Sequence, residues 1–513
     1  MKITKELLLN LSLLAIVFIY GIAFTFLRQF SGIINTLYMI IIPFLILLAV
    51  FKLSAINQIK VLLACSMIGI DYPLMVIPVL VYPFLILSRK YNKLKTPAFF
   101  ALIFLLYALL IYFVVLFTTF NLLSFPFWLM SFGSGLLLFI YYSQFDFTKK
   151  DLSNIFTIFI KLIIVQLILI AFQFLKFGRF ISGDWAEGSL NSADKAGFYL
   201  LILLIYFLSP LWMKFLPYEN SNISFKKVLK CILWIIILAP FIWLSSAKTI
   251  YGILYFSIII FFIVLSIWVV LRNRSFVNRD YKALIAGGLI SIILLFLFPA
   301  IFNFYGSHLS RPEFTLKDTI ERYTNYKDSN QKYLLYKRVF KDFYVNEGIL
   351  VFSLGTGPGT FDSRASNSRA YDVLYKTDVA RISGFFPPYS SSYTKEYLGD
   401  LYNEDIAMSV GGRSALLSIP FAGIASLKAE LGIIGLVLFL LMCCSSIYLL
   451  SKYLIFDRVE PLIGFILSVW WIFLPFAMVV DNFQEQPQIV FPLYLLTAVG
   501  LLINKNNSQF QNA

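Results

Sequence analysis

Long apolar runs constrain this chain more than any other feature of its sequence. They recur along most of its 513 residues, and a helix of about 20 such residues crosses a hydrocarbon core of about 30 Å. Hydrophobic residues make up 60% and charged residues 13%, whereas soluble domains average about 45–50% and about 25%. The runs are continuous rather than alternating, which favours helices over barrel strands. The sequence therefore predicts an all-α polytopic membrane protein.

The apolar runs predict about 12–14 transmembrane helices. Two short or re-entrant segments are expected between 61 and 87, with Asp71 at the turn between them, and the count depends on whether this hairpin crosses. The other expected spans lie at about 6–27, 33–52, 98–117, 125–144, 153–175, 196–215, 230–244, 249–271, 283–302, 430–451, 462–480 and 488–504.

The net charge of +15 is explained by basic residues in short connections between spans. Lysine and arginine gather in cytoplasmic connections of membrane proteins. Placing both termini in the cytoplasm puts the strongly basic connections, such as 89–95 and 149–150, on that side. We therefore expect a multi-pass protein with both termini cytoplasmic, and we expect no nucleic-acid partner.

One long polar stretch interrupts the apolar runs and divides the chain into three parts. Spans with short loops occupy 1–302, a large extracytoplasmic loop occupies 303–428, and the last three spans and a cytoplasmic tail occupy 429–513. A loop of this length is usually functional. Apolar residues at helical spacing in 332–340 predict short amphipathic helices lying against the membrane.

Basic residues on the expected outer face are candidates for binding an anion. The planar guanidinium group donates paired, charge-assisted hydrogen bonds to phosphate and pyrophosphate. The alternative is that these arginines are solvated or pair with acids of the same loop. Lys248 differs because it lies at a span boundary, where a cation needs a partner or must reach the interface. The candidates are Arg179, Lys248, Arg364, Arg369, Arg381 and Arg413.

A glycine-rich segment, Gly355-Thr-Gly-Pro-Gly-Thr-Phe, lies in the large loop. It lacks the endings and spacings of nucleotide-binding motifs, but a tight turn there can present backbone N–H groups to an anion, which makes Gly357 and Gly359 binding candidates. The four cysteines lie in apolar segments and the chain has one histidine. No metal and no cofactor are therefore expected.

Four features, taken in order, resemble the O-antigen polymerase/ligase superfamily of bacterial membrane glycosyltransferases (Wzy-like). Their shared outer placement and the topology carry the resemblance, which covers about 176–440. They are Gly188–Ala193 leading into Gly197–Leu200, Ser245–Lys248, Gly355–Phe361 and Ala429–Leu436.

The resemblance implies a GT-C-like, metal-independent glycosyltransferase in the bacterial cytoplasmic (inner) membrane. Its donor and acceptor would be oligosaccharides on undecaprenyl pyrophosphate, polymerised on the outer face into O-antigen, capsule or exopolysaccharide, with a chain-length-regulating co-polymerase as a further partner. The ligase branch usually has a histidine shortly before the Glu-x-Gly segment, and this chain has none at 419–426. Lys248 also stands where relatives often have arginine. Both departures favour a polymerase.

The resemblance and the residue chemistry together suggest roles for ten residues. We expect catalytic roles for Lys248, Arg364, Arg381 and Glu430. Substrate binding is expected of Arg179, Asn191, Arg369, Arg413, Gly357 and Gly359. Two alternatives stay open, an O-antigen ligase-type transferase and a flippase or transporter of lipid-linked oligosaccharides.

Overall fold

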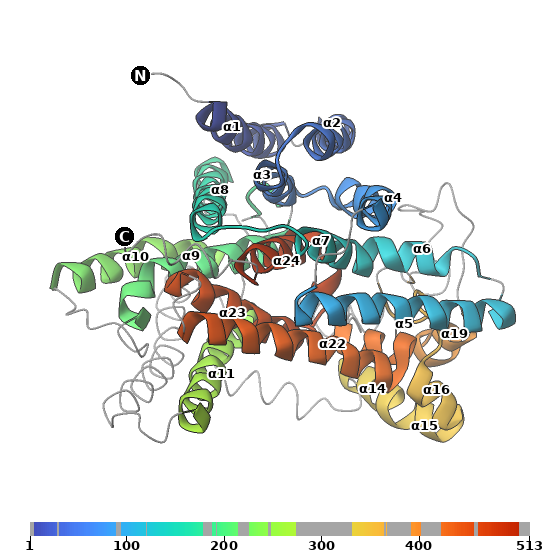
Figure 1. The fold of residues 1–513 in the computed structure, drawn as a ribbon. Helices are drawn as coiled ribbons and strands as arrows, with labels where there is room; N and C mark the ends of the chain where they lie inside the picture. Colours follow the sequence, from blue (N-terminus) through green and yellow to red (C-terminus); the bar gives the residue numbers. More distant parts are fainter. Residues whose placement is uncertain are drawn as a thin grey trace.

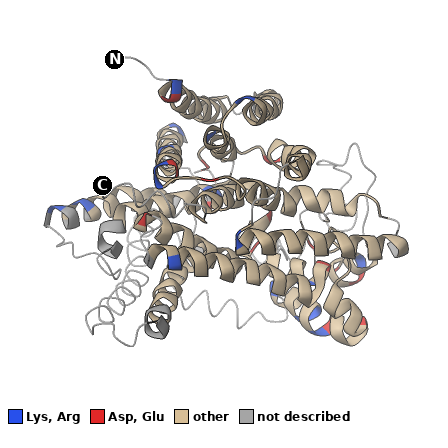
Figure 2. Ribbon diagram, in the orientation of Figure 1, with Lys and Arg blue, Asp and Glu red and all other residues tan. Residues whose placement is uncertain are grey.

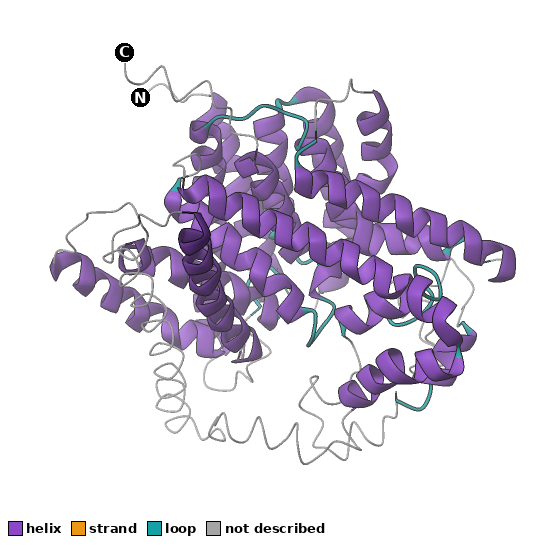
Figure 3. Cartoon of the chain, turned by 60° about the horizontal axis from the view of Figure 1, so that its bottom comes forward, coloured by secondary structure: helices purple, strands orange, loops and turns teal. Residues whose placement is uncertain are grey.

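A computed structural model of the chain is all-helical over the residues it describes, and no strand is formed within them (Figures 1 and 3). The described residues are 5–27, 30–88, 94–119, 121–177, 187–190, 192–213, 225–244, 248–272, 331–363, 366, 391–401, 422–455 and 460–501.

The long helices follow the apolar runs closely. They are α1 (Lys5–Phe26), α2 (Ser31–Lys52), α3 (Ala55–Ser66), α4 (Asp71–Ser88), α5 (Thr96–Thr119), α6 (Ser124–Trp128) continuing through the π-turn η2 (Leu129–Gly133) into α7 (Ser134–Tyr142), α8 (Lys149–Phe177), α9 (Ala193–Met213), α10 (Phe225–Leu244), α11 (Lys248–Arg272), α22 (Gly423–Ile455), α23 (Pro461–Ala477) and α24 (Pro487–Leu501).

Eight described helical stretches are long and apolar enough to cross a membrane, and four shorter apolar helices accompany them. This confirms the expected polytopic helical membrane architecture. As expected, a break divides 61–87, since α3 ends at Ser66 and α4 begins at Asp71. The span expected at 283–302 lies outside the described residues, and the number of crossings stays a prediction.

The centre of the bundle is formed by α24 and α7, in which every residue is buried. A helix that is apolar on all sides is accommodated either by a protein core or by lipid, and these two helices are enclosed by protein. Helix α24 packs against α7, α3, α8 and α23, and α22 packs against α5 and α23. On the periphery, α2 leaves Phe44 and Phe51 64% and 68% exposed, as expected of side chains that face lipid. Charged residues are sparse along the long helices, and many of them lie near helix ends (Figure 2).

Several connections meet at one end of the bundle, called here the shared end. The N–H of Gly69, between α3 and α4, donates to the Ser189 carbonyl, which lies just before α9, at 2.7 Å. The N–H of Gly423 donates to the carbonyl of Asp481 at 3.4 Å. The starts of α4, α9, α22 and α24 therefore lie together, as the expected topology requires. Which compartment this end faces stays a prediction.

The opposite end carries a buried lysine near the N-terminus. The Lys60 ammonium lies 2.8 Å from the Glu6 carboxylate, and its side chain is 1% exposed. Lys150, in the first turn of α8, also interacts electrostatically with the Glu6 carboxylate. This grouping brings together the start of α1, the start of α8 and the first half of α3.

The described part of the large loop folds into short helices beside α22 (Figure 1). A small core of apolar side chains, which includes Val339, Phe343 and Leu398, packs on Ala425 and Ala429 of α22. Alanine at these positions permits close approach of the helices. The short helices are α14 (Gln331–Lys337), η5 (Arg338–Asp342), α15 (Phe343–Asn346), α16 (Gly348–Leu354) and α19 (Ser392–Leu398).

A paired salt bridge fastens α19 to η5. Both terminal nitrogens of Arg338 bind the Asp400 carboxylate, at 2.5 and 2.7 Å. The hydrogen bonds from Arg338 hold the pKa of Asp400 below its usual value. The stabilisation is therefore present above the ordinary carboxyl pKa and is lost as the pH falls through the lowered one. Because Asp400 is 65% exposed, this contribution is small.

Candidate functional site

The glycine-rich turn of the large loop docks onto a break in α22. Gly432 has φ 65° and ψ −173° inside this helix, so the chain changes direction there. The N–H groups of Thr356 and Gly357 donate to the carbonyls of Ala429 and Glu430, both at 2.9 Å. Carbonyls at a helix break need partners from outside the helix, and the turn supplies them. We call the contact between 355–363 and 429–432 the junction.

The side chain of Glu430 also belongs to the junction, because its carboxylate accepts hydrogen bonds from the backbone of 359–363. Its Oε2 accepts the N–H of Gly359 at 2.9 Å, and its Oε1 accepts the N–H groups of Phe361 at 3.0 Å and Ser363 at 3.3 Å. Glu430 is 1% exposed. The N–H groups of the glycine turn therefore bind a side chain of the same chain, and the binding of an external anion by this turn stays a prediction. A catalytic role for Glu430 stays a prediction.

Two glycines of the turn lie where no side chain fits. A Cβ on Gly355 would lie 2.3 Å from the carbonyl oxygen of Glu430, and one on Gly359 would lie 2.4 Å from that of Ser124. Both have positive φ, 87° and 74°, which L-residues rarely adopt. Gly357 also has positive φ, 107°. Gly355 and Gly359 thus allow close approach of the backbone, and substrate binding by Gly357 and Gly359 stays a prediction.

The loop is also held by polar contacts to the α23–α24 connection. The buried carboxylate of Asp362 accepts from the Ser426 hydroxyl at 3.3 Å, and its backbone carbonyl accepts from the Asn482 amide at 3.1 Å. Lys332 of α14 donates to the Val480 carbonyl. Burial lowers the pKa of Lys332, an effect that the nearby carboxylates, including that of Asp362, oppose. The loop thus rests on the shared end through both backbone and side chains.

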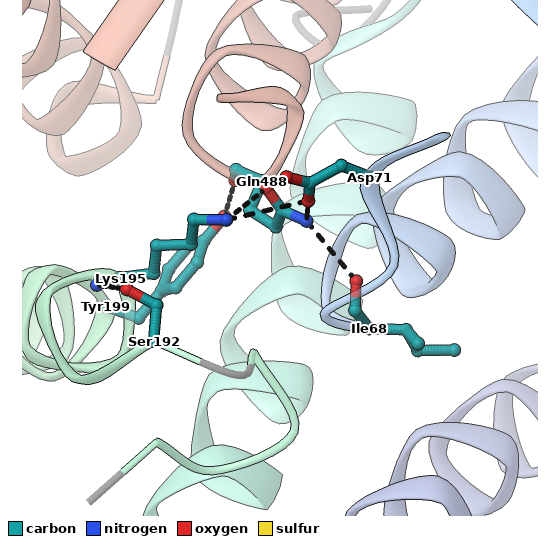
Figure 4. Close-up of polar contacts among 6 residues, drawn as sticks. All are labelled: Ile68, Asp71, Ser192, Lys195, Tyr199 and Gln488. Atoms are coloured by element: carbon teal, nitrogen blue, oxygen red, sulfur yellow. Dashed lines mark hydrogen bonds and ion pairs between the residues drawn. The ribbon is translucent and has the colours of Figure 1, made fainter. Parts of the chain in front are cut away.

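A second polar cluster joins the starts of α4, α9 and α24 (Figure 4). The Lys195 ammonium lies 3.5 Å from the Asp71 carboxylate, with the side chains 11% and 10% exposed. The Gln488 side chain bridges them, since its oxygen accepts from Lys195 at 2.9 Å and its nitrogen donates to Asp71. The Tyr199 hydroxyl donates to the Gln488 carbonyl. The cluster ties three span ends together.

Removing both partners of this ion pair should cost less than the sum of the two single removals. Asp71→Asn or Lys195→Met leaves a charge in a nearly dry site, at about 2–4 kcal/mol each, and the double variant should recover about 1–3 kcal/mol of the sum. Thermal unfolding in detergent would measure this cycle. The control cycle is Arg338→Met with Asp400→Asn, where exposure should limit coupling to below about 1 kcal/mol. Additive losses at Asp71 and Lys195 would contradict the account.

Three amide oxygens between the two clusters are buried without a hydrogen-bond partner in the described structure. They belong to Asn482, Gln484 and Gln486. Buried carbonyl oxygens normally find a donor. The α23–α24 connection thus contains unpartnered amide oxygens. Such oxygens can accept hydrogen bonds from hydroxyl groups.

Both arginine-bearing segments of the loop begin and end beside the junction. Ser363, before the first segment, donates its N–H to Glu430, while Ser391, after it, donates its hydroxyl to the Thr360 carbonyl. Leu401 and Ala422, which flank the second segment, pack in the same small core. The flanks of 364–390 and 402–421 are therefore anchored at one place.

The structure places some of the expected site residues and not others. Gly357, Gly359 and Glu430 meet in the junction. Lys248 is the first residue of α11, and its side chain is not described. Outside the described residues lie Arg179, Asn191, Arg364, Arg369, Arg381 and Arg413.

Several residues of the site were not singled out from sequence, among them the amides of the α23–α24 connection. Lys195 lies at a span boundary, which is the same signal that drew attention to Lys248. Gln488 is a polar residue at the start of an apolar run, and Lys332 is the first residue of the amphipathic segment 332–340. A search for polar side chains at span ends would have found Lys195 and Gln488.

Neither protein-family models nor curated proteins match this chain.

Proposed function

We propose that the protein is an integral membrane glycosyltransferase that polymerises undecaprenyl-pyrophosphate-linked oligosaccharide repeat units on the outer face of the bacterial cytoplasmic membrane. The observation that carries the proposal is the anchoring of the large loop at the shared end. Both segments that contain the loop's candidate arginines, Arg364, Arg369, Arg381 and Arg413, have their flanks fixed beside the junction.

The proposed chemistry needs cations beside a lipid surface. When the donor glycan is transferred, negative charge develops on the departing pyrophosphate, and positioned cations stabilise it. Arginine suits this task because its planar group binds two oxygens at once. Lys248 and Arg179 would complete the cationic set from the neighbouring connections. The acceptor is the terminal sugar hydroxyl of a second lipid-linked unit.

The acceptors of the α23–α24 connection support a sugar ligand. Sugar hydroxyls donate hydrogen bonds, and in this proposal they would donate to the amide oxygens of Asn482, Gln484 and Gln486, which are buried without a partner in the described structure. Asn191 would add an amide from the connection before α9. In this account Glu430 acts as a positioning residue, since its carboxylate already binds three backbone N–H groups.

The proposal predicts a ladder of lengthened lipid-linked products from purified protein in nanodiscs supplied with its native repeat unit. Arg364→Ala and Lys248→Ala should each lower the rate about 100-fold or more, because each removes charge stabilisation in the transition state. Lys395→Ala on α19, an exposed lysine, is the control and should leave the rate within about twofold. Movement of the lipid between leaflets without any ladder would contradict the proposal and favour a flippase.

A further inference from the structure

An uncharged, apolar surface lies on α15 and α16, outside any candidate span. Val345, Ile349 and Leu350 are 69%, 70% and 69% exposed, and Tyr344 is 54% exposed. Helix α16 has no buried residue. Soluble surfaces rarely gather such side chains without a partner. We call these four residues the apolar edge.

Charge flanks the apolar edge on its N-terminal side, where the exposed Lys341 lies three and four residues before Tyr344 and Val345. Glu347 is the one charged residue between Phe343 and Phe361 in the sequence. It faces the loop interior, where it accepts the hydroxyl of Tyr397 at 2.7 Å. The four side chains of the edge are themselves uncharged, as suits a surface in contact with hydrocarbon, and Lys341 beside them is long enough for its ammonium group to reach water.

The packing of α16 fixes the depth of the apolar edge. Helix α16 packs on α22, and a Cβ on Gly432 would lie 2.0 Å from the carbonyl oxygen of Ser353, so the end of α16 touches the break. Beyond the break, 433–454 forms about 22 helical residues, roughly 33 Å, enough to cross the hydrocarbon core. A membrane boundary at the break would place the end of α16, and the apolar edge just before it, at the interface.

The lipid-facing surface of α22 continues from this position. Ile434, Val437 and Leu441 follow the break and are 41%, 48% and 41% exposed. Their spacing of three and four residues places them on one face of the helix. An apolar surface that continues a lipid-facing helix at the depth of the interface is suited to lipid.

We propose that α15 and α16 form a wedge that inserts into the outer leaflet, with Val345, Ile349 and Leu350 among the upper parts of the acyl chains. Interfacial helices bury their apolar face about 5–10 Å into the headgroup and acyl boundary. Because Gly355, the first residue of the junction, directly follows α16, contact with the leaflet sets the height of the glycine turn above the membrane. This inference does not depend on the proposed enzymatic activity.

Spin labels on the full chain in lipid nanodiscs test the wedge. Cys444 is the exposed cysteine and is first replaced by serine, while Cys65, Cys231 and Cys443 are buried. Labels at Ile349→Cys and, separately, Val345→Cys should be more accessible to oxygen than to a water-soluble nickel complex, at a depth of about 5–10 Å. The control is Glu396→Cys, an exposed position on α19, which should show the reverse preference.

Two outcomes would overturn the wedge. One is nickel accessibility at positions 345 and 349 that equals that of the control. The other is dipolar broadening between labels that disappears on dilution with unlabelled protein, which would mean that a second copy of the chain covers the edge. Two independent label positions guard against a local disturbance at either one.

Discussion

Replacing Glu430 with glutamine should loosen the junction and lower stability by about 3 kcal/mol. The glutamate offers two oxygens to the N–H groups of Gly359, Phe361 and Ser363. Glutamine retains one acceptor and turns an NH₂ group toward N–H donors, so that at least one buried donor loses its partner. Thermal unfolding of purified protein in detergent measures the loss, and the rate of ladder formation measures its consequence.

The same variant separates two roles of Glu430. If the carboxylate positions the loop, the stability and the rate fall together. A catalytic base would instead show a lost rate at an unchanged unfolding temperature. Glu396→Gln, an exposed glutamate on α19, is the control and should change neither quantity. Wild-type stability in Glu430→Gln would show that the junction does not hold the loop.

Replacing Gly432 with alanine should have an equal or larger effect, a loss of at least about 3 kcal/mol. The residue has φ 65° and ψ −173°, a conformation that only glycine adopts without strain. A Cβ there would also lie 2.0 Å from the Ser353 carbonyl oxygen and 2.6 Å from the Leu354 nitrogen. The end of α16 would have to move, and the glycine turn would move with it.

A matched glycine provides the control for this substitution. Gly252 lies within α11, and a Cβ at that position would meet nothing within 4 Å. Gly252→Ala should therefore leave stability unchanged or raise it by up to about 1 kcal/mol. Expression level and unfolding temperature in detergent compare the two variants. Equal behaviour would mean that α22 tolerates a straight helix and that the break is not required.

The helices could be predicted from sequence because each one depends on a pattern of residues within its own segment. Spans depend on apolar runs, and the break at Asp71 depends on a charged residue followed by Pro73. The break in α22 was not predicted, because the expected span at 430–451 treats Gly432 as an ordinary helix residue. Glycine is common within membrane helices, so its presence alone does not indicate a break.

The candidate site was predicted only in its parts. The glycine turn and the segment around Glu430 were both singled out, and an anion at the turn was expected. That the turn binds Glu430 depends on a contact between residues about 70 positions apart, which no local pattern contains. The ion pair between Asp71 and Lys195 likewise joins residues that are far apart in the sequence. Such contacts arise from the packing of whole helices, here α3, α8 and α24, around one core.

Sidedness of the reaction tests the central claim most directly. In proteoliposomes, the fraction of protein whose loop faces outward is measured by labelling Glu396→Cys, in the Cys444→Ser background, with an impermeant reagent. A water-soluble, short-chain form of the lipid-linked repeat unit is then added outside. We expect the amount of polymer to be proportional to the fraction of protein whose loop faces outward. The protein in the opposite orientation should become active only after the vesicles are opened. Polymer formed only by protein with its loop inside, or uptake of substrate without polymer, would contradict the account.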